Sequence, residues 1–324
     1  MDEMNSTAKY VGDIPVAKPS GERLPLSASV RIPSLLSGAS LRPVRNVVRK
    51  FKVRILMCGF RKQREIVQSI EDASASESMS IVVPVHDAPA VTRRCLASLE
   101  KYAPKAEIVL VDDGSSLVET KDIIRDFIGR NRWKLVQHEK PFGHSVACEA
   151  GASLATRPYL CLLNSDTVVT PSCWRLLKQV FEYDDNIAVA GPSTSHSSNP
   201  QALPVAVYLR THWNDNQICD FAMRLLAKCP DLDVADLSWA SGFAFFIRLN
   251  VWKQLGGFDR NLPDYGNELE LCNRVAAMGY RTVWVRNAYI HHLGGQSYRE
   301  SIGEDGIAAR KLSTWIYVKE KKLS

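Results

Sequence analysis

The sequence predicts an α/β protein with a mostly parallel central sheet flanked by helices. Short apolar runs recur at 80–85, 106–112 and 159–163, and the first two are rich in β-branched residues. Segments whose apolar residues follow a helical period separate these runs, as in βαβ units. Polar or acidic side chains come directly after several of the runs. In such sheets ligands bind beyond the carboxyl ends of the strands, so the pattern also predicts where a site lies.

Four strands and the helices between them make up the predicted first half. The strands are expected at 80–85, 106–115, 133–139 and 157–166. Helical spacing predicts helices over 88–102 and 117–129, and a glycine-bounded loop over 143–151 is expected to lead into a third helix. The rhythm of alternating strands and helices favours parallel pairing because each crossover needs a helix.

The second half of the sequence is more mixed. Helices are predicted at 171–184, 249–259 and 267–280, and strands at 186–192 and 281–288, with an apolar segment at 237–248. Residues 193–235 are polar and irregular and are expected to carry loops. A loop is predicted over 291–298, followed by a C-terminal tail, 298–324, that is expected to be helical.

Composition excludes several protein classes. Hydrophobic residues make up 45% of the 324 residues, which is too many for a chain that is disordered throughout. No run reaches the roughly 18–20 apolar residues of a membrane-spanning helix, and the N-terminus lacks a basic start with an apolar core. We therefore expect a cytoplasmic protein. The eight cysteines form no C-x-x-C pair, which favours buried thiols over disulfides or a zinc site.

The basic charge is concentrated in one segment of an N-terminal extension, predicted to span 1–78. Residues 42–64 contain nine Lys or Arg and no acid, whereas the whole chain has a net charge of +6. Apolar residues at helical spacings in this segment suggest an amphipathic helix on the anionic inner face of a membrane. A helix packed on the body with its bases in water remains an equal alternative. Few aromatic residues are present to stack bases, so no nucleic-acid partner is expected. Residues 1–40 are expected to be flexible and 71–80 to form a polar linker.

Two acidic groups follow predicted strands. Asp112 and Asp113 end the second strand, and their carboxylates could accept hydrogen bonds from a nucleoside or simply cap a turn. Asn164, Ser165 and Asp166 end the fourth strand. A carboxylate such as Asp166 can bind Mg²⁺ or Mn²⁺, although an aspartate at this position is also a common turn residue.

Two further groups stand near the C-terminal end. Glu268 and Glu270 open a predicted helix, where acids are favoured by the helix dipole. Residues at i and i+2 do not share a helix face, so only one of the two can point into a cleft and act as a general base. His291 and His292 precede a glycine pair, and a neutral imidazole is a good metal ligand.

Taken together, these motifs resemble the family 2 glycosyltransferases, inverting enzymes with a GT-A fold, and in particular the rhamnosyltransferase-like enzymes of bacterial surface polysaccharides. The resemblance covers about 79–297. It is carried, in the order expected for the family, by SIVVPVHDAPAVTRRCLASL, IVLVDDGS, PFGHSVACEAG, LLNSDTVVTP, SGFAFFIRLNVWKQLGGFD, NELELCNRVAAMGYR and HHLGGQS. It implies a single catalytic GT-A domain.

The resemblance also implies roles for individual residues. Asp166 and His292 would bind a divalent cation, Mn²⁺ or Mg²⁺, on the donor diphosphate. Glu268 would be the catalytic base and Glu270 the second acid of that motif. The nucleotide-sugar would be bound by the set Pro84, His86, Asp112, Asp113, Gly143, Asn164 and Ser165, and Trp239 and Gly242 would border the donor and acceptor cleft.

The implied reaction transfers a sugar from a UDP- or dTDP-sugar to a hydroxyl of a glycan or lipid-linked glycan. The sequence departs from the family pattern at His86 and Asp87, where an aromatic residue and Asn are usual, at Glu149, usually Asn, and at Asn267, usually Glu. These departures keep open a catalytically silent relative that binds glycans or serves as a scaffold. A sugar nucleotidyltransferase is less compatible, because no glycine-rich basic loop follows the first strand.

Overall fold

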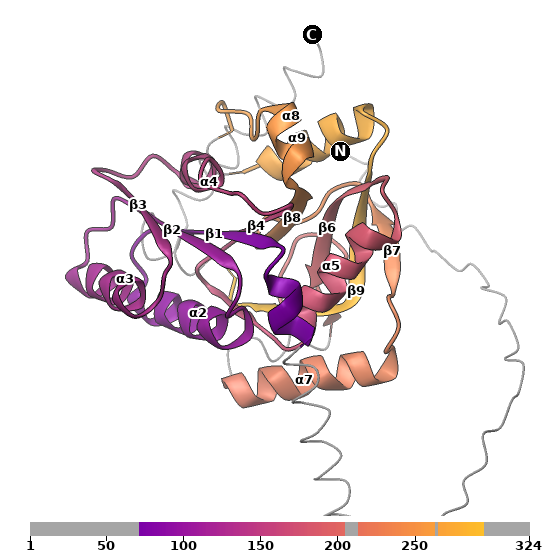
Figure 1. Cartoon of the computed structure of the whole chain (residues 1–324), viewed down its shortest axis with the longest axis horizontal. Helices are drawn as coiled ribbons and strands as arrows, with labels where there is room; N and C mark the ends of the chain where they lie inside the picture. Colours follow the sequence, from indigo (N-terminus) through magenta and orange to yellow (C-terminus); the bar gives the residue numbers. More distant parts are fainter. Residues whose placement is uncertain (1–70, 205–212, 263–264, 295–324) are drawn as a thin grey trace, which may run out of the picture. The chain divides into compact units, whose positions relative to one another are not determined.

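The computed structural model describes residues 71–204, 213–262 and 265–294, and these ranges contain a nine-stranded sheet flanked by helices (Figure 1). The strand order is β3-β2-β1-β4-β8-β6-β9-β5, with β7 paired to β9. The predicted α/β class with a mostly parallel central sheet is confirmed. The basic segment 42–64, the rest of 1–70 and the tail 298–324 lie outside the described residues, so the predictions about them stay predictions.

The parallel half of the sheet, residues 79–163, follows the predicted βαβ order. Its strands are β1 (Met79–Val85), β2 (Glu107–Asp113), β3 (Lys134–His138) and β4 (Tyr159–Leu163), and its helices are α2 (Pro89–Tyr102), α3 (Val118–Arg130) and α4 (His144–Ala152). β1 pairs in parallel with both β2 and β4, and β2 pairs in parallel with β3. The carboxyl ends of these strands therefore meet at one edge.

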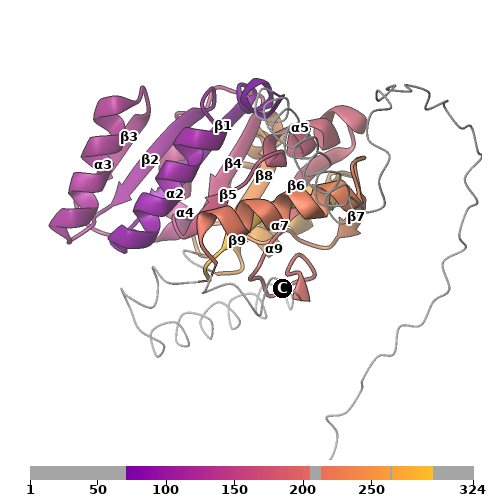
Figure 2. The same ribbon diagram turned by 90° about the horizontal axis from the view of Figure 1, so that it is seen from below.

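Two apolar cores lie on opposite faces of the sheet. Along β1, Ile81 and Val83 belong to one core and Val82 to the other, because successive side chains of a strand point to opposite faces. The first core is covered by α2, α3 and α5 (Cys173–Tyr183). The second is covered by α4, α8 (Leu249–Leu255) and α9 (Asn267–Ala277). Figure 2 shows α2, α3, α5 and α7 (Asp215–Lys228) on the near side of the sheet.

The mixed half, residues 164–294, pairs its strands in both directions. It contains β5 (Thr167–Val169), β6 (Ile187–Ser193), β7 (Val234–Leu237), β8 (Ala244–Arg248) and β9 (Arg281–His292). β8 runs antiparallel to β4 and β6, whereas β6 and β9 are parallel. The long strand β9 also pairs antiparallel with β5 and β7.

Two predicted loops are instead regular structure. Within 143–151, α4 begins directly after Gly143, whose φ of 96° ends the preceding turn. A side chain at Gly151 would lie 2.3 Å from Val82, so glycine allows this helix to pack closely on the sheet. Within 193–235, α7 is set by a capping box between Asn214 and Gln217.

The predicted loop at 291–298 is also wrong at its start. His291 and His292 are the last two residues of β9 and pair with β5, so their side chains point to opposite faces of the strand. The period-2 pattern of this strand is hidden in the sequence because both of its faces are buried.

The polar linker expected over 71–80 is not one. Residues 71–76 are helical, and β1 begins at Met79. Asp72 is 1% exposed, and its carboxylate accepts hydrogen bonds from the backbone N–H groups of Ser172 and, at 3.1 Å, of Arg175. These are N–H groups of the first turn of α5, so a polar residue is buried here because it caps another helix. Burial raises the pKa of Asp72 to about 7.

Within the described ranges, no helix combines the length and the apolar character that crossing a membrane requires.

Candidate active site

Asp113 lies at the carboxyl end of β2, where the sequence predicts it, but its carboxylate is bound by the chain itself. One oxygen accepts hydrogen bonds from Phe142 N at 2.9 Å and from His138 Nδ1 at 2.7 Å, and the other accepts from Gly143 N at 2.9 Å. Asp113 is 5% exposed. It therefore fixes the turn that leads into α4, and Gly143 contributes a backbone N–H to the same turn.

The neighbouring predicted nucleotide-binding residues also make local contacts. Asp112 accepts a hydrogen bond from Ser115 N at 2.9 Å, and His86 Nδ1 lies 2.9 Å from the carbonyl oxygen of Asp113. Pro84 pairs with Val111 within the sheet and is half-buried. These residues line the carboxyl edge of the parallel half, as expected, and His86 remains partly exposed there.

Asp87, one of the departures from the family pattern, caps a helix. Its carboxylate accepts hydrogen bonds from the backbone N–H groups of Ser116 and Leu117 at 2.9 and 2.8 Å, and from the Ser116 hydroxyl at 2.8 Å. The pKa of Asp87 is lowered, since these donors outweigh the opposing effect of partial burial. The unusual acid thus anchors the start of α3.

Asp166 and His292 come together in the mixed half. Asp166 is 2% exposed and lies just before β5, and the pairing of β5 with β9 brings the end of β9 beside it. His292 Nε2 lies 3.2 Å from Asp166 Oδ1. The other ring nitrogen, Nδ1, lies 2.9 Å from the carbonyl oxygen of His196. Because a carbonyl can only accept, Nδ1 carries a proton, and a neutral ring would therefore have its lone pair on Nε2, facing Asp166.

This pair fits a divalent cation. A carboxylate oxygen and an imidazole lone pair converge, and the Asn164 side-chain oxygen, two residues before Asp166, is a buried acceptor with no hydrogen-bond donor within the described ranges. No cluster of three or more His, Cys, Asp or Glu converges in the part of the chain that is described. Mg²⁺ and Mn²⁺ commonly take few protein ligands and complete their shell with water and phosphate oxygens. Ser165, between the two, is buried.

Glu268 lies at the start of α9 and faces Gly242. A methyl group at residue 242 would lie 1.7 Å from Glu268 Oε1, so only glycine leaves room for this carboxylate. Burial raises the pKa of Glu268 to about 7, with only its own backbone N–H opposing the shift. A carboxylate with a pKa near neutrality is suited to act as a general base.

One segment connects Asp166 and His292, the two candidate cation ligands, to Glu268. Phe243 stacks on the His292 ring, with centroids 5.3 Å apart and planes 18° apart, and its carbonyl accepts from Asn164 N at 2.9 Å. The adjacent residue, Gly242, contacts Glu268. The structure therefore places Asp166, His292 and Glu268 around residues 242–243, although they are far apart in the sequence.

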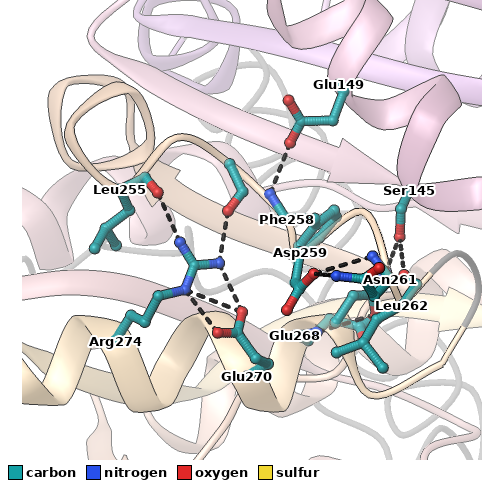
Figure 3. A network of polar contacts seen from close by, with 12 residues as sticks. Ser145, Glu149, Leu255, Phe258, Asp259, Asn261, Leu262, Glu268, Glu270 and Arg274 are labelled. Atoms are coloured by element: carbon teal, nitrogen blue, oxygen red, sulfur yellow. Dashed lines mark hydrogen bonds and ion pairs between the residues drawn. The ribbon is translucent and has the colours of Figure 1, made fainter. Parts of the chain in front are cut away.

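Glu270 has a different environment from Glu268 (Figure 3). Its carboxylate binds Arg274, with the closest contact at 2.7 Å, and Arg274 also donates to the carbonyl oxygens of Leu255 and Gly257 at 2.7 Å each. The expected second acid of the motif is thus part of an ion pair that holds the turn after α8. This agrees with the expectation that Glu268 and Glu270, which are two residues apart, lie on different faces of the helix.

Glu149, another departure, supports the same turn from α4. It accepts a hydrogen bond from Phe258 N at 2.7 Å, and a methyl group at Gly257 would lie 1.9 Å from its Oε1 (Figure 3). Partial burial raises the pKa of Glu149. The acid at this position has a structural role.

Sequence reasoning missed the loop that positions His292. The Ser195 hydroxyl donates to the His292 carbonyl at 2.8 Å and accepts from His292 N at 3.0 Å, while the His196 carbonyl binds the ring. Gly294, at φ 85°, is so close to His196 that a side chain would lie 2.7 Å from its ring. The only sequence signal was a polar Ser, Thr and His run after a buried strand. His291 faces the other way, stacking on Trp213.

Trp239 and Gly242 flank a short segment that two polar side chains support. The Trp239 carbonyl accepts a hydrogen bond from Asn199 Nδ2 at 3.1 Å, and Ser241 N donates to Gln201 Oε1 at 2.8 Å. Trp239 packs against the second core and is partly exposed. Asn199 and Gln201, which the sequence did not single out, therefore set the wall beside Glu268.

The fold and these residues agree with a family match. Residues 80–219 match the model described as Glycosyl transferase family 2. This segment of the chain is therefore similar to the family, in agreement with the order of the motifs.

Two curated proteins are similar to the chain over part of their length. The chain is 25% identical over 241 residues to the O-antigen biosynthesis protein RfbC of Myxococcus xanthus, an alignment that covers 70% of this chain and 18% of the relative. It is 33% identical over 230 residues to validoxylamine A glucosyltransferase of Streptomyces hygroscopicus subsp. limoneus, covering 62% of this chain and 48% of the relative. The chain thus spans about half or less of the length of these relatives.

A solved structure supports the fold. The crystal structure of GalNAc-T7 with UDP, GalNAc and Mn²⁺ superimposes with a TM-score of 0.52 at 20% identity, covering 66% of this chain and 43% of that one. The expected GT-A fold is therefore confirmed.

Proposed function

We propose that the chain is an inverting glycosyltransferase that transfers a sugar from a nucleotide-sugar to a hydroxyl of a glycan or lipid-linked glycan. The main support is the half-buried residue Glu268, whose carboxylate lies against Gly242 beside the segment that contacts His292. The similarity to an O-antigen biosynthesis protein and to a glucosyltransferase supports the same class of reaction.

In the proposed reaction, Glu268 removes the proton of the acceptor hydroxyl. The acceptor oxygen forms a bond to the anomeric carbon as the bond from that carbon to the diphosphate oxygen breaks. Attack occurs from the face opposite the leaving group, so the anomeric configuration inverts and the nucleoside diphosphate carries away the bonding electron pair. The pKa of about 7 leaves Glu268 partly deprotonated at neutral pH, as a general base requires.

Asp166 and His292 are proposed to hold a Mn²⁺ or Mg²⁺ ion that, when bound, neutralises charge on the leaving diphosphate. The tautomer of His292 set by the His196 carbonyl suits this role. The turn fixed by Asp113, together with His86 and Asp112, is proposed to bind the nucleoside, with a UDP- or dTDP-sugar as the donor.

The alternative, a catalytically silent binding or scaffold protein, is weakened by what the departures do. Asp87 and Glu149 accept hydrogen bonds from backbone N–H groups of turns and a helix start. Both lie outside the set of Asp166, His292 and Glu268. These two departures thus have structural roles that are compatible with turnover.

The test is a thermal-shift panel of UDP, GDP, dTDP and CMP, each with Mn²⁺, Mg²⁺ or EDTA, followed by turnover of the matching nucleotide-sugars. A ligand that binds only the folded state raises the melting temperature. We expect one nucleotide to give a shift that EDTA abolishes, and a product with inverted anomeric configuration. Binding without turnover, or a product with retained configuration, would contradict the proposal.

A further inference from the structure

Asn267, the first residue of α9, forms a hydrogen-bond bridge between α9 and α4. It is 0% exposed. Its side-chain oxygen accepts from Glu268 N at 3.0 Å, and its Nδ2 donates to Ser145 Oγ of α4 at 2.8 Å. Ser145 Oγ in turn donates to the carbonyl of Leu262 at 2.6 Å (Figure 3 labels Ser145, Leu262 and Glu268).

The direction of each hydrogen bond in this bridge is fixed. The Leu262 carbonyl can only accept, so the single hydroxyl hydrogen of Ser145 points to it. Ser145 therefore offers only lone pairs to residue 267. The backbone N–H of Glu268 can only donate. Residue 267 must consequently be a donor at one end and an acceptor at the other, which an amide satisfies and a carboxylate does not.

Burial, and not a neighbouring charge, raises the pKa of Glu268. The thiols of Cys148 on α4 and Cys272 on α9 have pKa values that burial raises, and the negative charge of Glu268 raises them further. Glu270 is paired with Arg274, and the segment 239–243 carries no charge. An acid at 267, the residue type usual in the family, would place a second negative charge beside Glu268 in a buried corner.

We propose that Asn267 is the positioning residue for Glu268, because its amide ties the first turn of α9 to Ser145, holds the Glu268 carboxylate against Gly242, and keeps a second charge away from it. This inference rests on the proposed function in assigning Glu268 as the base. Two parts of the inference can be measured without any substrate: the absence of a second charge beside Glu268, which is the charge component, and the hydrogen bond between Asn267 and Ser145, which is the anchor.

The first experiment is a double-mutant cycle of Asn267→Asp and Glu268→Gln, read by thermal unfolding at pH 5 to 9. We expect Asn267→Asp to lower the melting temperature most above pH 7, where both carboxylates ionise, and to cost clearly less in the Glu268→Gln background. The same isosteric change at Asn261, an exposed residue bonded to Asp259, is the matched control and should cost little in either background. An equal loss for Asn267→Asp in both backgrounds would overturn the charge component.

The second experiment tests the anchor, and it stays informative if Asn267→Asp fails to fold. Ser145→Ala removes the acceptor of the Asn267 amide without adding charge. We expect faster amide hydrogen exchange at Glu268 in this variant and no change in the pH dependence of unfolding. Unchanged exchange would overturn the anchor.

The third experiment measures kcat/KM against pH with the donor found in the nucleotide panel. Asn267→Asp should shift the acidic limb upward by about one pH unit or more, which a purely structural role would not do. If Glu268→Gln turns over at the wild-type rate while the unfolding cycle still shows coupling, the proposed base is wrong and the Asn267 contacts stand.

Discussion

Asp87 and Asp113 in the parallel half of the sheet and Glu268 in the mixed half are carboxylates with opposite surroundings. In the parallel half, Asp87 and Asp113 are each bound by three donors of the chain, and the pKa of Asp87 is lowered. In the mixed half, Glu268 faces a glycine, and burial raises its pKa. Carboxylates surrounded by donors shape the fold, whereas those without such donors retain their capacity for substrates and protons.

The largest effect is expected from a substitution of Asp166, one of the two candidate cation ligands. Asp166→Asn keeps the shape but removes the charge, and we expect transfer to fall about 10³-fold or more, because metal-supported charge stabilisation contributes several kcal/mol. The affinity for Mn²⁺, measured by electron paramagnetic resonance with and without UDP, should fall together with the rate of transfer. Wild-type Mn²⁺ affinity in this variant would remove Asp166 from the site.

Adjacent histidines provide a matched control for that experiment. His292→Asn should weaken Mn²⁺ binding, whereas His291→Phe should retain it, since His291 stacks on Trp213 and bonds Tyr289 on the opposite face. His291→Phe is expected to change only the melting temperature. Equal effects of the two changes on Mn²⁺ binding would contradict the assignment of faces.

The next largest effect is expected at Glu268. Glu268→Gln should lower kcat about 10²–10⁴-fold and abolish the acidic limb of the pH profile near 7. Glu270→Gln is the control, because it breaks the ion pair with Arg274 and should lower the melting temperature while leaving that limb in place. If the acidic limb of the pH profile persists in Glu268→Gln, the ionisation that causes it belongs to another group.

Glu268→Gln also tests the raised pKa of Glu268 through the pH dependence of folding stability. The pKa of Glu268 in the folded state, about 7, exceeds its ordinary value of 4.5, so the folded state binds the proton more tightly than the unfolded state. The contribution of Glu268 to stability is therefore greatest below pH 4.5 and is lost as the pH rises towards 7. Glu268→Gln should consequently melt at a higher temperature than the wild type at pH 8. A lower melting temperature there would contradict a desolvated carboxylate.

A smaller effect is expected when the space beside Glu268 is filled. Gly242→Ala places a methyl group where Glu268 Oε1 lies, so the carboxylate must move. A displacement of about 1 Å can cost up to 10²-fold in rate, and we expect a loss of about 10–100-fold in kcat with the fold retained. Gly129→Ala is the control, because Gly129, like Gly242, has no positive φ, and a methyl group there meets no atom within 4 Å. Full activity in Gly242→Ala would separate this glycine from the base.

The smallest effect on activity is expected in the parallel half. Asp87→Ala removes the cap of α3 and should cost about 1 kcal/mol of folding free energy, measured by denaturant unfolding. Because its carboxylate bonds only to the start of α3, turnover should stay within a fewfold of the wild type. A loss as large as that of Glu268→Gln would make Asp87 part of the substrate site.

Local sequence was sufficient for most of the architecture. Apart from α4, which occupies a predicted loop, the strands and helices of the parallel half lie within a few residues of their predicted bounds, because each apolar run or helical stripe is complete in itself. The elements missed were those whose signal depends on distant partners. Asp72 is a buried polar residue only because α5 supplies its donors, and His291 and His292 belong to a strand only because β5 pairs with it.

The sequence by itself determined the fold class, the order of the motifs and the residue types available for chemistry. Only the tertiary structure decided which acids those motifs leave for chemistry. Asp87, Asp113, Glu149 and Glu270 look no different in the sequence from Asp166 and Glu268. The distinction is physical, because a carboxylate's role depends on the donors and the burial around it, and residues far away in the chain supply both.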